Sequence, residues 1–214
     1  MTDKPRLFGA DYSVYVRIAR LALLEKNVDH ALVPVDIFAR DGVPDWYLER
    51  HPFKRIPAFE HGALRLSETS AITRYVDEAF DGPALQPAAA TERAIVNQII
   101  GLLDSYAYRA MVWGVYVEGV SKPKRGETPD AALIATSLET AATCLATLSR
   151  SIGDADWLAG GGRLTLADLH AAPILAYFTR APEGRSLLAG HANLALWWER
   201  MRGRASFEAT RPSD

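Results

Sequence analysis

One continuous stretch, from His51 to Val76, constrains the fold of this chain most strongly: HPFKRIPAFEHGALRLSETSAITRYV. The runs IPAFE and LRLS are short and apolar, and the glycine between them suits a turn, so they predict the two strands of a β-hairpin. Pro57 has no N–H to donate to a strand ladder, which places it before the first strand rather than inside it. The following run has helical periodicity and begins at the polar residues Glu68, Thr69 and Ser70.

The first 80 residues alternate between short apolar runs and amphipathic ones. RLFG and ALVPVDI are predicted strands, and the proline in the second suits the edge of a sheet. VYVRIARLALLEKN and PDWYLERH are predicted helices. Together with the hairpin and the helix after it, the order is βαβαββα. This order predicts one small sheet, parallel where helices cross over and antiparallel at the hairpin.

The second part of the chain has a different pattern. DGPALQPAAA is rich in proline, glycine and alanine, which is typical of a linker. Helical patterns follow near residues 91–120, 128–151 and 166–178, and another lies in the tail HANLALWWERMRGR. We therefore predict an α+β protein with a mixed domain over residues 1–80, a linker over 81–90 and an all-helical domain over 91–214.

The predicted helix near residue 166 has a clear start signal in RLTLADLHAAPILAYF. Thr165 is placed as the N-cap, and Asp168, three residues later, is placed to bond back to it. Leu164 and Leu169 are placed for a hydrophobic staple across the same turn. We interpret this pair as a structural cap for a buried helix, with no role in chemistry.

Charge and composition exclude several classes of protein. The chain has 24 basic and 26 acidic side chains and no long block of either sign, so neither nucleic acid nor a membrane is an expected partner. Cys144 is the single cysteine and lies at helical spacing among apolar residues, which favours a buried thiol. No run of 18 apolar residues and no signal peptide is visible, so we expect a soluble cytoplasmic protein. The five histidines show no paired ligand spacing, so we expect no metal.

Two predicted helix starts can carry chemistry. Ser13 follows the first strand and would begin the first helix, and Glu68 and Thr69 begin the helix after the hairpin. Helix N-termini present free N–H groups and a partial positive charge, so they favour anions. Such starts gather outside the carboxyl ends of the strands. The expected ligand has carboxylates or a thiolate, and an ammonium for Glu68 to pair. Simple capping remains the alternative for each residue taken alone.

The stretches LFGADYSVYVRIARLALLEKN, RHPFKRIPAFEHGALRLSETSAITRYV and WLAGGGRLTLADLHAAP together resemble the cytosolic glutathione transferase family. The resemblance runs through almost the whole chain and is closest to the serine-type classes, such as phi and theta. It implies a thioredoxin-like N-terminal domain, a helical C-terminal domain, a homodimer and glutathione as the co-substrate.

The resemblance also assigns roles to the polar residues. It implies a cis bond before Pro57, so that the backbone of Ile56 pairs with the cysteine of glutathione. Glu68 and Thr69 would hold the γ-glutamyl end, and Ser13 would donate to the sulfur, with Tyr12 as the backup donor. The phi-type histidine and lysine that bind the glycine end are replaced here by Gly42 and Val43. Three cations are placed to take over that carboxylate: Arg40, Lys54 and Arg55.

The pocket for the second substrate is less clearly marked. In the family, the helix containing DSYAYRAMVWGVYVE lines this pocket, which points to Tyr106, Arg109 and Trp113, with Tyr12 and Tyr15 from the first domain. At α-helical spacing Tyr106 and Trp113 share a face with Tyr116. A core or dimer-contact role is an equal alternative for these rings.

The resemblance implies a detoxifying enzyme that conjugates the glutathione thiolate to a small, hydrophobic electrophile. Two alternatives stay open. One is a non-catalytic member that keeps the fold for binding or interaction, and the other is a glutathione-dependent isomerase or ether-cleaving enzyme on the same site. Cysteine-type chemistry is disfavoured, because no thiol lies near Ser13.

Overall fold

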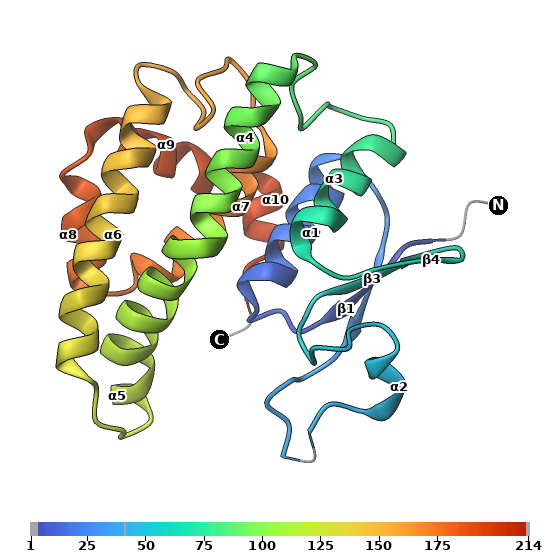
Figure 1. Cartoon of the computed structure of the whole chain (residues 1–214), viewed down its shortest axis with the longest axis horizontal. Helices are drawn as coiled ribbons and strands as arrows, with labels where there is room; N and C mark the ends of the chain where they lie inside the picture. Colours follow the sequence, from blue (N-terminus) through green and yellow to red (C-terminus); the bar gives the residue numbers. More distant parts are fainter. Residues whose placement is uncertain (1–3, 41, 213–214) are drawn as a thin grey trace. The chain divides into compact units, whose positions relative to one another are not determined.

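The computed structural model describes residues 4–40 and 42–212 of the chain (Figure 1). It divides into two compact units. The first unit contains the chain up to Gln86 together with the segment from Arg204 onward, and the second unit runs from Pro87 to Gly203.

The first unit is built on a four-stranded mixed sheet. Its strands lie in the order β2-β1-β3-β4, with β1 and β2 parallel and the other two neighbouring pairs antiparallel. This arrangement confirms the predicted hairpin and the edge position of the proline-containing strand. The strands are β1 (Arg6–Gly9), β2 (Ala31–Pro34), β3 (Ala58–His61) and β4 (Leu64–Leu66). The helices of this unit are α1 (Val14–Glu25), α2 (Asp45–Leu48), α3 (Thr69–Ala79) and α10 (Ala205–Ala209).

The two faces of this sheet carry different residues, because side chains alternate along each strand. Leu7 and Phe59 are direct cross-strand neighbours, and both are fully buried. Their neighbours Arg6 and Glu60 face the opposite side and form an ion pair of 2.5 Å. On the apolar side α1 packs against α3, and most of the residues of α1 are buried.

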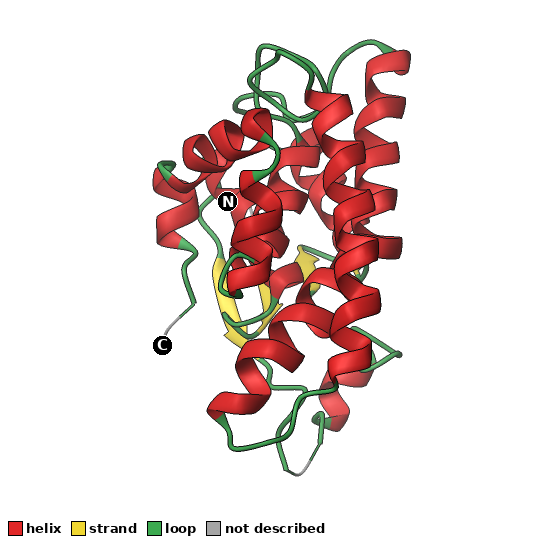
Figure 2. Ribbon diagram, turned by 90° about the vertical axis from the view of Figure 1, so that its left-hand side faces the viewer, coloured by secondary structure: helices red, strands yellow, loops and turns green. Residues whose placement is uncertain are grey.

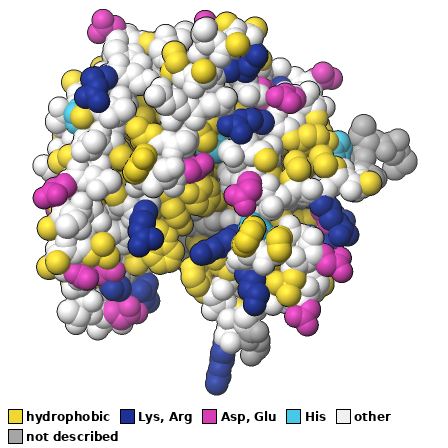
Figure 3. All heavy atoms as spheres, viewed as in Figure 1, with side chains coloured by type: hydrophobic (Ala, Val, Ile, Leu, Met, Phe, Trp, Pro, Cys, Tyr) yellow, Lys and Arg dark blue, Asp and Glu magenta, His cyan; other side chains and the backbone are white. Residues whose placement is uncertain are grey.

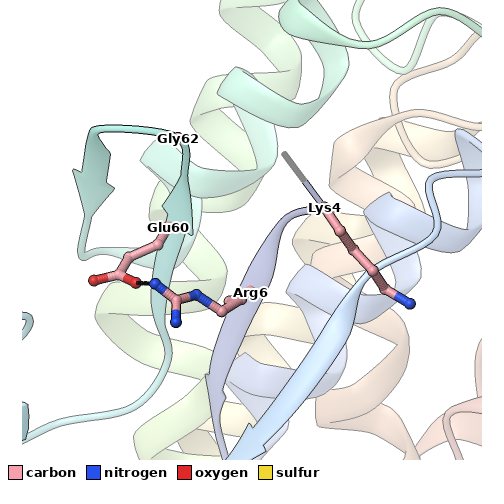
Figure 4. A pocket seen from close by; sticks show the side chains of 4 residues that line it. All are labelled: Lys4, Arg6, Glu60 and Gly62. Carbon is pink, nitrogen blue, oxygen red and sulfur yellow. Dashed lines mark hydrogen bonds and ion pairs between the residues drawn. The ribbon is translucent and has the colours of Figure 1, made fainter. Parts of the chain in front are cut away.

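The outer face of the sheet holds a cluster of charges around Glu60, whose side chain is only 5% exposed. Arg6 contacts one carboxylate oxygen, while the Nε atoms of Arg50 and Arg65 lie 3.0 and 3.1 Å from the other. Figure 4 shows Arg6 and Glu60 beside Lys4 and Gly62, where they line a hollow of about 240 Å³. None of these four residues belongs to the site predicted from the sequence.

A buried ion pair joins the end of α1 to the end of α3. Lys26 Nζ lies 3.3 Å from Asp77 Oδ1 and donates to the Asp77 carbonyl at 3.0 Å. The same carboxylate accepts the backbone N–H of Leu85 at 2.7 Å and the side-chain amide of Gln86 at 3.1 Å. Asp77 therefore holds the chain at the point where it leaves the first unit.

The regular secondary structure of the second unit, over residues 87–203, is all helical, as the sequence predicts (Figure 2). The helix α7 has nearly every residue buried, and both α6 and α7 pack against η1. A Cβ atom on Gly114 of η1 would lie 1.9 Å from Ser137 Oγ of α6, so this close approach requires glycine. The elements are α4 (Ala90–Leu102), η1 (Leu103–Ser121), α5 (Lys122–Lys124), α6 (Ala131–Ile152), α7 (Leu166–Phe178), α8 (Pro182–Ala189) and α9 (Ala192–Arg202).

Three expectations from the sequence differ from the structure. The helix predicted near 91–120 is α-helical only to Leu102 and continues as a π-helix, whose bonds span five residues rather than four. The short helices α5, α8 and α10 were not predicted, because so few residues carry little periodic signal. The helical domain was expected to reach residue 214, whereas the described segment from Arg204 belongs to the first unit.

One helix among the described residues, α6, is long and apolar enough to cross a membrane by length and composition. A single helix of this kind is weak evidence, because a core helix of a globular protein has the same properties. Figure 3 shows basic and acidic side chains interspersed over the face in view, without a large patch of one sign.

The predicted cap of α7 is part of a larger buried network. Asp168 Oδ2 accepts the Thr165 N–H at 2.8 Å and the Thr165 hydroxyl at 2.9 Å, which confirms that Asp168 bonds back to the N-cap. Its other oxygen accepts the Leu158 N–H at 2.8 Å and the Trp197 indole N–H at 2.9 Å. Burial raises the pKa of Asp168, and these four hydrogen bonds oppose that effect. Asp168 thus joins the loop before α7, the start of α7 and α9.

Replacing the Asp168 carboxylate should lower the free energy of unfolding by more than the loss of an ordinary N-cap does. Asp168→Ala leaves three buried N–H donors and a hydroxyl without their acceptor, and we expect the free energy of unfolding to fall by about 3 kcal/mol. The matched control is Asp130→Ala at the start of α6, where the exposed carboxylate accepts only the Leu133 N–H in the same role. We expect about 1 kcal/mol there. Urea denaturation measures the free energy of unfolding of both variants. Equal losses in the two would contradict the stabilising role of the hydrogen-bond network around Asp168.

Candidate active site

Ser13 lies at the turn between β1 and α1. It is the N-cap of α1, and its hydroxyl accepts the Val16 N–H at 3.4 Å. The hydroxyl is half-buried and, as an acceptor in this bond, retains its proton for donation to a ligand. The two interpretations of Ser13, as a cap and as a donor, are therefore compatible in one geometry.

The turn before Ser13 is tightly packed around Gly9. A Cβ atom at this position would lie 2.4 Å from Val16 Cγ2 and 3.3 Å from Ile56 Cβ. No side chain fits there, so glycine allows the end of β1 to approach both α1 and the segment before β3. This close packing brings Ile56 beside the turn that leads to Ser13.

The segment before β3 has the backbone that the resemblance implied. The Ile56–Pro57 peptide bond is cis, and both residues are buried. The carbonyl of Arg55 accepts the Tyr47 hydroxyl at 2.8 Å, which anchors this segment to α2. The side chains of Lys54 and Arg55 are exposed, and so is Arg40 in the loop after β2. All three cations are accessible to a carboxylate in solution.

Glu68 and Thr69 form the start of α3, as predicted. Glu68 occupies the N-cap position with a φ of 66°, and its exposed side chain makes no capping hydrogen bond. Its carbonyl accepts the N–H groups of Ala71 and Ile72, each at 3.0 Å. Thr69 is the first residue of the helix and is buried. The Glu68 carboxylate is therefore not used in capping its own helix.

His51 lies near this site and was not identified from the sequence. Its side chain is only 3% exposed, and its Nδ1 atom is buried without a hydrogen-bond partner. Burial lowers the pKa of His51, the nearby Glu68 carboxylate acts against this effect, and Arg55 adds to it. No spacing or motif marked this histidine, because its proximity to Glu68 arises only when the loop folds back against α3.

The environment of Tyr12 differs from the prediction that made it the backup donor. Its hydroxyl donates to Asp36 Oδ1 at 2.7 Å, and the same oxygen accepts the Phe38 N–H at 2.9 Å. Burial, this hydrogen bond and the negative charges of Asp36 and Asp11 raise the pKa of Tyr12 well above its usual value. A hydroxyl has one proton, so donation to a sulfur would require Tyr12 to leave Asp36. Tyr15, in the first turn of α1, is half-buried.

The residues predicted for the second-substrate pocket on η1 are accessible. Tyr106 is 61% and Trp113 is 43% exposed, and Arg109 is also exposed. Tyr116 instead packs against Tyr177, with ring centroids 4.7 Å apart, and Arg180 lies over both rings. The expectation that Tyr116 shares a face with the other two relied on α-helical spacing, which a π-helix does not have.

In the part of the chain that the structure describes, no group of three or more His, Cys, Asp or Glu side chains is placed to hold a metal ion. Cys144 is buried in α6, and burial raises the pKa of its thiol. Cys144 is not among the residues of the site described above.

Comparison with known proteins gives two family matches. Residues 7–84 match the model of the glutathione S-transferase N-terminal domain, and residues 131–200 match that of the C-terminal domain. A glutathione S-transferase of Arabidopsis thaliana is 30% identical over 209 residues, covering 97% of this chain and 94% of the relative. Another, of Hyoscyamus muticus, is 30% identical over 193 residues and covers 90% of each chain.

Solved structures show the same similarity. A glutathione transferase of Populus trichocarpa superposes with a TM-score of 0.84 at 29% identity, covering 96% of this chain and 97% of that one. Glutathione S-transferase I of maize, in complex with an atrazine glutathione conjugate, gives a TM-score of 0.84 at 26% identity, covering 97% and 96%. The sequence and the fold agree over nearly the whole length, and this chain belongs to the glutathione transferase family.

Proposed function

We propose that this glutathione transferase joins the thiolate of glutathione to a small, hydrophobic electrophile, with Ser13 as the activating donor. The observation that carries the proposal is the packing at Gly9, which brings the Ile56–Pro57 segment beside the turn that presents Ser13. The maize relative solved with an atrazine glutathione conjugate supports conjugation as the reaction.

Glutathione would lie extended along the Ile56–Pro57 segment. The backbone of Ile56 would pair with the cysteinyl residue as an added strand, which places the sulfur near the N-terminus of α1. At one end, the Glu68 carboxylate would pair with the ammonium of the γ-glutamyl group, and the Thr69 hydroxyl would donate to its carboxylate. At the other end, the glycine carboxylate would meet the exposed cations Arg40, Lys54 and Arg55.

The chemistry requires the sulfur to lose its proton. A thiol with a pKa near 8.5 is mostly protonated at neutral pH, and each unit of lowering needs about 1.4 kcal/mol of preference for the thiolate. A hydrogen bond from Ser13 and the N-terminus of α1 both favour the charged form. The thiolate then attacks the electrophilic carbon, a carbon–sulfur bond forms, and the leaving group departs with the electron pair of the bond that breaks.

The second substrate would contact the accessible aromatic and cationic side chains of η1: Tyr106, Arg109 and Trp113. Aromatic rings offer large apolar area at low entropic cost, which suits small hydrophobic electrophiles. Family membership also leads us to propose a cytoplasmic homodimer. In the single chain the side chain of Phe53, in the loop before β3, is 75% exposed. Such exposure is expected for a ring that becomes buried when two subunits associate.

The affinity for glutathione tests the roles of Glu68 and Thr69 at the start of α3. Glu68→Gln and Thr69→Ala each leave a charged group of the ligand without its partner, and charge-assisted hydrogen bonds contribute about 1.5–3 kcal/mol. We expect each variant to weaken glutathione binding at least about tenfold by calorimetry. Glu78→Gln, at the far end of the same helix, is the matched control and should bind normally. Unchanged affinity in folded Glu68→Gln would remove Glu68 from the site.

The thiolate absorbance of bound glutathione, followed against pH, tests the role of Ser13. Ser13→Ala removes the donor, so the pKa of the thiol should rise and the rate at neutral pH should fall, with partial recovery at high pH. Binding should change little, because the contacts at Ile56, Glu68 and Thr69 remain.

Tyr12→Phe serves as the comparison for this experiment. Its hydroxyl already donates to Asp36, so the titration of the thiol should match that of the wild type. If the pKa of the bound thiol shifts in Tyr12→Phe and stays unchanged in Ser13→Ala, the activating donor is Tyr12 rather than Ser13. A wild-type protein that binds glutathione but converts no electrophile would support the non-catalytic alternative.

A further inference from the structure

Four segments of the first unit meet at one edge of its sheet. β1 and β2 are parallel, so the turn that leads to Ser13 and the loop after β2 begin at the same edge. β3 is antiparallel to β1, so the Ile56–Pro57 segment that precedes it reaches this edge as well. β4 is antiparallel to β3, so its end, which leads to Glu68, also lies there. The strand order β2-β1-β3-β4 then gives the order of the four segments along the edge.

This order sets the direction of a ligand that lies along the edge. Glu68 follows β4, the outermost strand on one side, and Ser13 follows β1, two strands further along. Neighbouring strands are about 4.8 Å apart, so an extended tripeptide of about 10 Å spans two such intervals. With its γ-glutamyl end at Glu68 and its sulfur at Ser13, glutathione would direct its glycine end toward the loop after β2, which carries Arg40.

Apolar packing holds only the start of this loop. Val35, directly after β2, is 3% exposed, and its N–H donates to the Gly9 carbonyl at 3.2 Å. None of residues 36–40 is buried, and the ring of Phe38 is 65% exposed. The part of the loop that leads to Arg40 therefore depends on specific contacts for its position.

Tyr12, the neighbour of Ser13, makes such contacts. Its hydroxyl donates to Asp36 Oδ1 at 2.7 Å, and the same oxygen accepts the Phe38 N–H at 2.9 Å. The rings of Tyr12 and Phe38 also lie together, with centroids 6.0 Å apart and planes inclined by 32°. Tyr12 thus joins the turn after β1 to the loop after β2, up to a point two residues before Arg40.

We propose that Tyr12 is a positioning residue for the glycine end of glutathione, because its contacts with Asp36 and Phe38 hold the loop that presents Arg40 to the glycine carboxylate. The proposal rests on the proposed function, since it assumes that glutathione binds along this edge. In this role Tyr12 keeps its proton on Asp36 and does not touch the ligand. A cation on a loop that is already in place loses less conformational freedom when it pairs with the carboxylate.

Tyr12→Phe removes the hydroxyl and leaves the ring in contact with Phe38. The loop must then be ordered when the ligand binds, so the affinity for glutathione should fall about threefold to tenfold. The thiol lies at the other helix start, so kcat at saturating glutathione should stay close to that of the wild type while KM for glutathione rises. Arg40→Gln removes the charge itself and should weaken glutathione binding about tenfold.

Calorimetry with two ligands tests the proposal: glutathione and its C-terminal amide, which has the same size but lacks the negative charge on the glycine. Tyr12→Phe and Arg40→Gln should each weaken the binding of glutathione and bind the amide within about twofold of the wild type. The double variant should bind glutathione no more weakly than Arg40→Gln alone, because Tyr12 then has no cation left to position.

Tyr75→Phe is the matched control. It also removes a hydroxyl of the first unit that is bonded to a side chain on another element, in this case His61 Nδ1 at 2.8 Å. It should bind both ligands normally. The melting temperature of each variant separates a loss of stability from a loss of affinity.

A purely structural role for Tyr12 predicts equal losses of affinity for glutathione and for the amide, and additive losses in the double variant. Either result overturns the inference, and so does normal glutathione binding in Arg40→Gln, which would assign the glycine carboxylate to another cation. Failure of the proposed function is distinguishable, because the wild type would then bind neither ligand.

Discussion

The close contact at Gly9 is the constraint on which the candidate site depends. Without a side chain at this position, the end of β1 can lie against Val16 of α1 and Ile56 of the segment before β3 at the same time. The two contacts bring together a helix start and an extended backbone segment that are more than 40 residues apart in the sequence. An added methyl group would push one of the two partners away, and protein interiors have few voids in which to absorb such a shift.

Much of the first unit could be predicted because its signals are local. The glycine-containing hairpin, the proline at a sheet edge and the amphipathic α1 and α3 each follow from fewer than 15 residues of sequence. The π-helical course of η1 and the short helices α8 and α10 could not be predicted in the same way. The hydrogen-bonding pattern of η1 is not visible in its apolar spacing, and α10 is held by long-range contacts from Arg17, Arg20 and Glu25.

In the candidate site too, the features with local sequence signals could be predicted and those set by long-range contacts could not. Ser13, Pro57 and Glu68 were identified because helix starts and prolines have recognisable sequence contexts, and the resemblance to a family supplied their roles. The bond from Tyr12 to Asp36 and the position of the buried His51 near Glu68 involve residues whose proximity no pattern reveals. For Asp168 the local signal indicated a cap, but the hydrogen bond from Trp197 comes from a residue 29 positions away.

The return of the chain to the first unit at Arg204 has a consequence for synthesis. The second unit, residues 87–203, is an insertion within the first, and the buried pair of Lys26 and Asp77 holds the chain where it leaves. Domains generally fold in order as they leave the ribosome. Here the first unit lacks α10 until the whole insertion has emerged. Until then, Arg17 and Glu25 of α1 lack their hydrogen-bond partners from the C-terminal segment. The unit that begins first is therefore the one completed last.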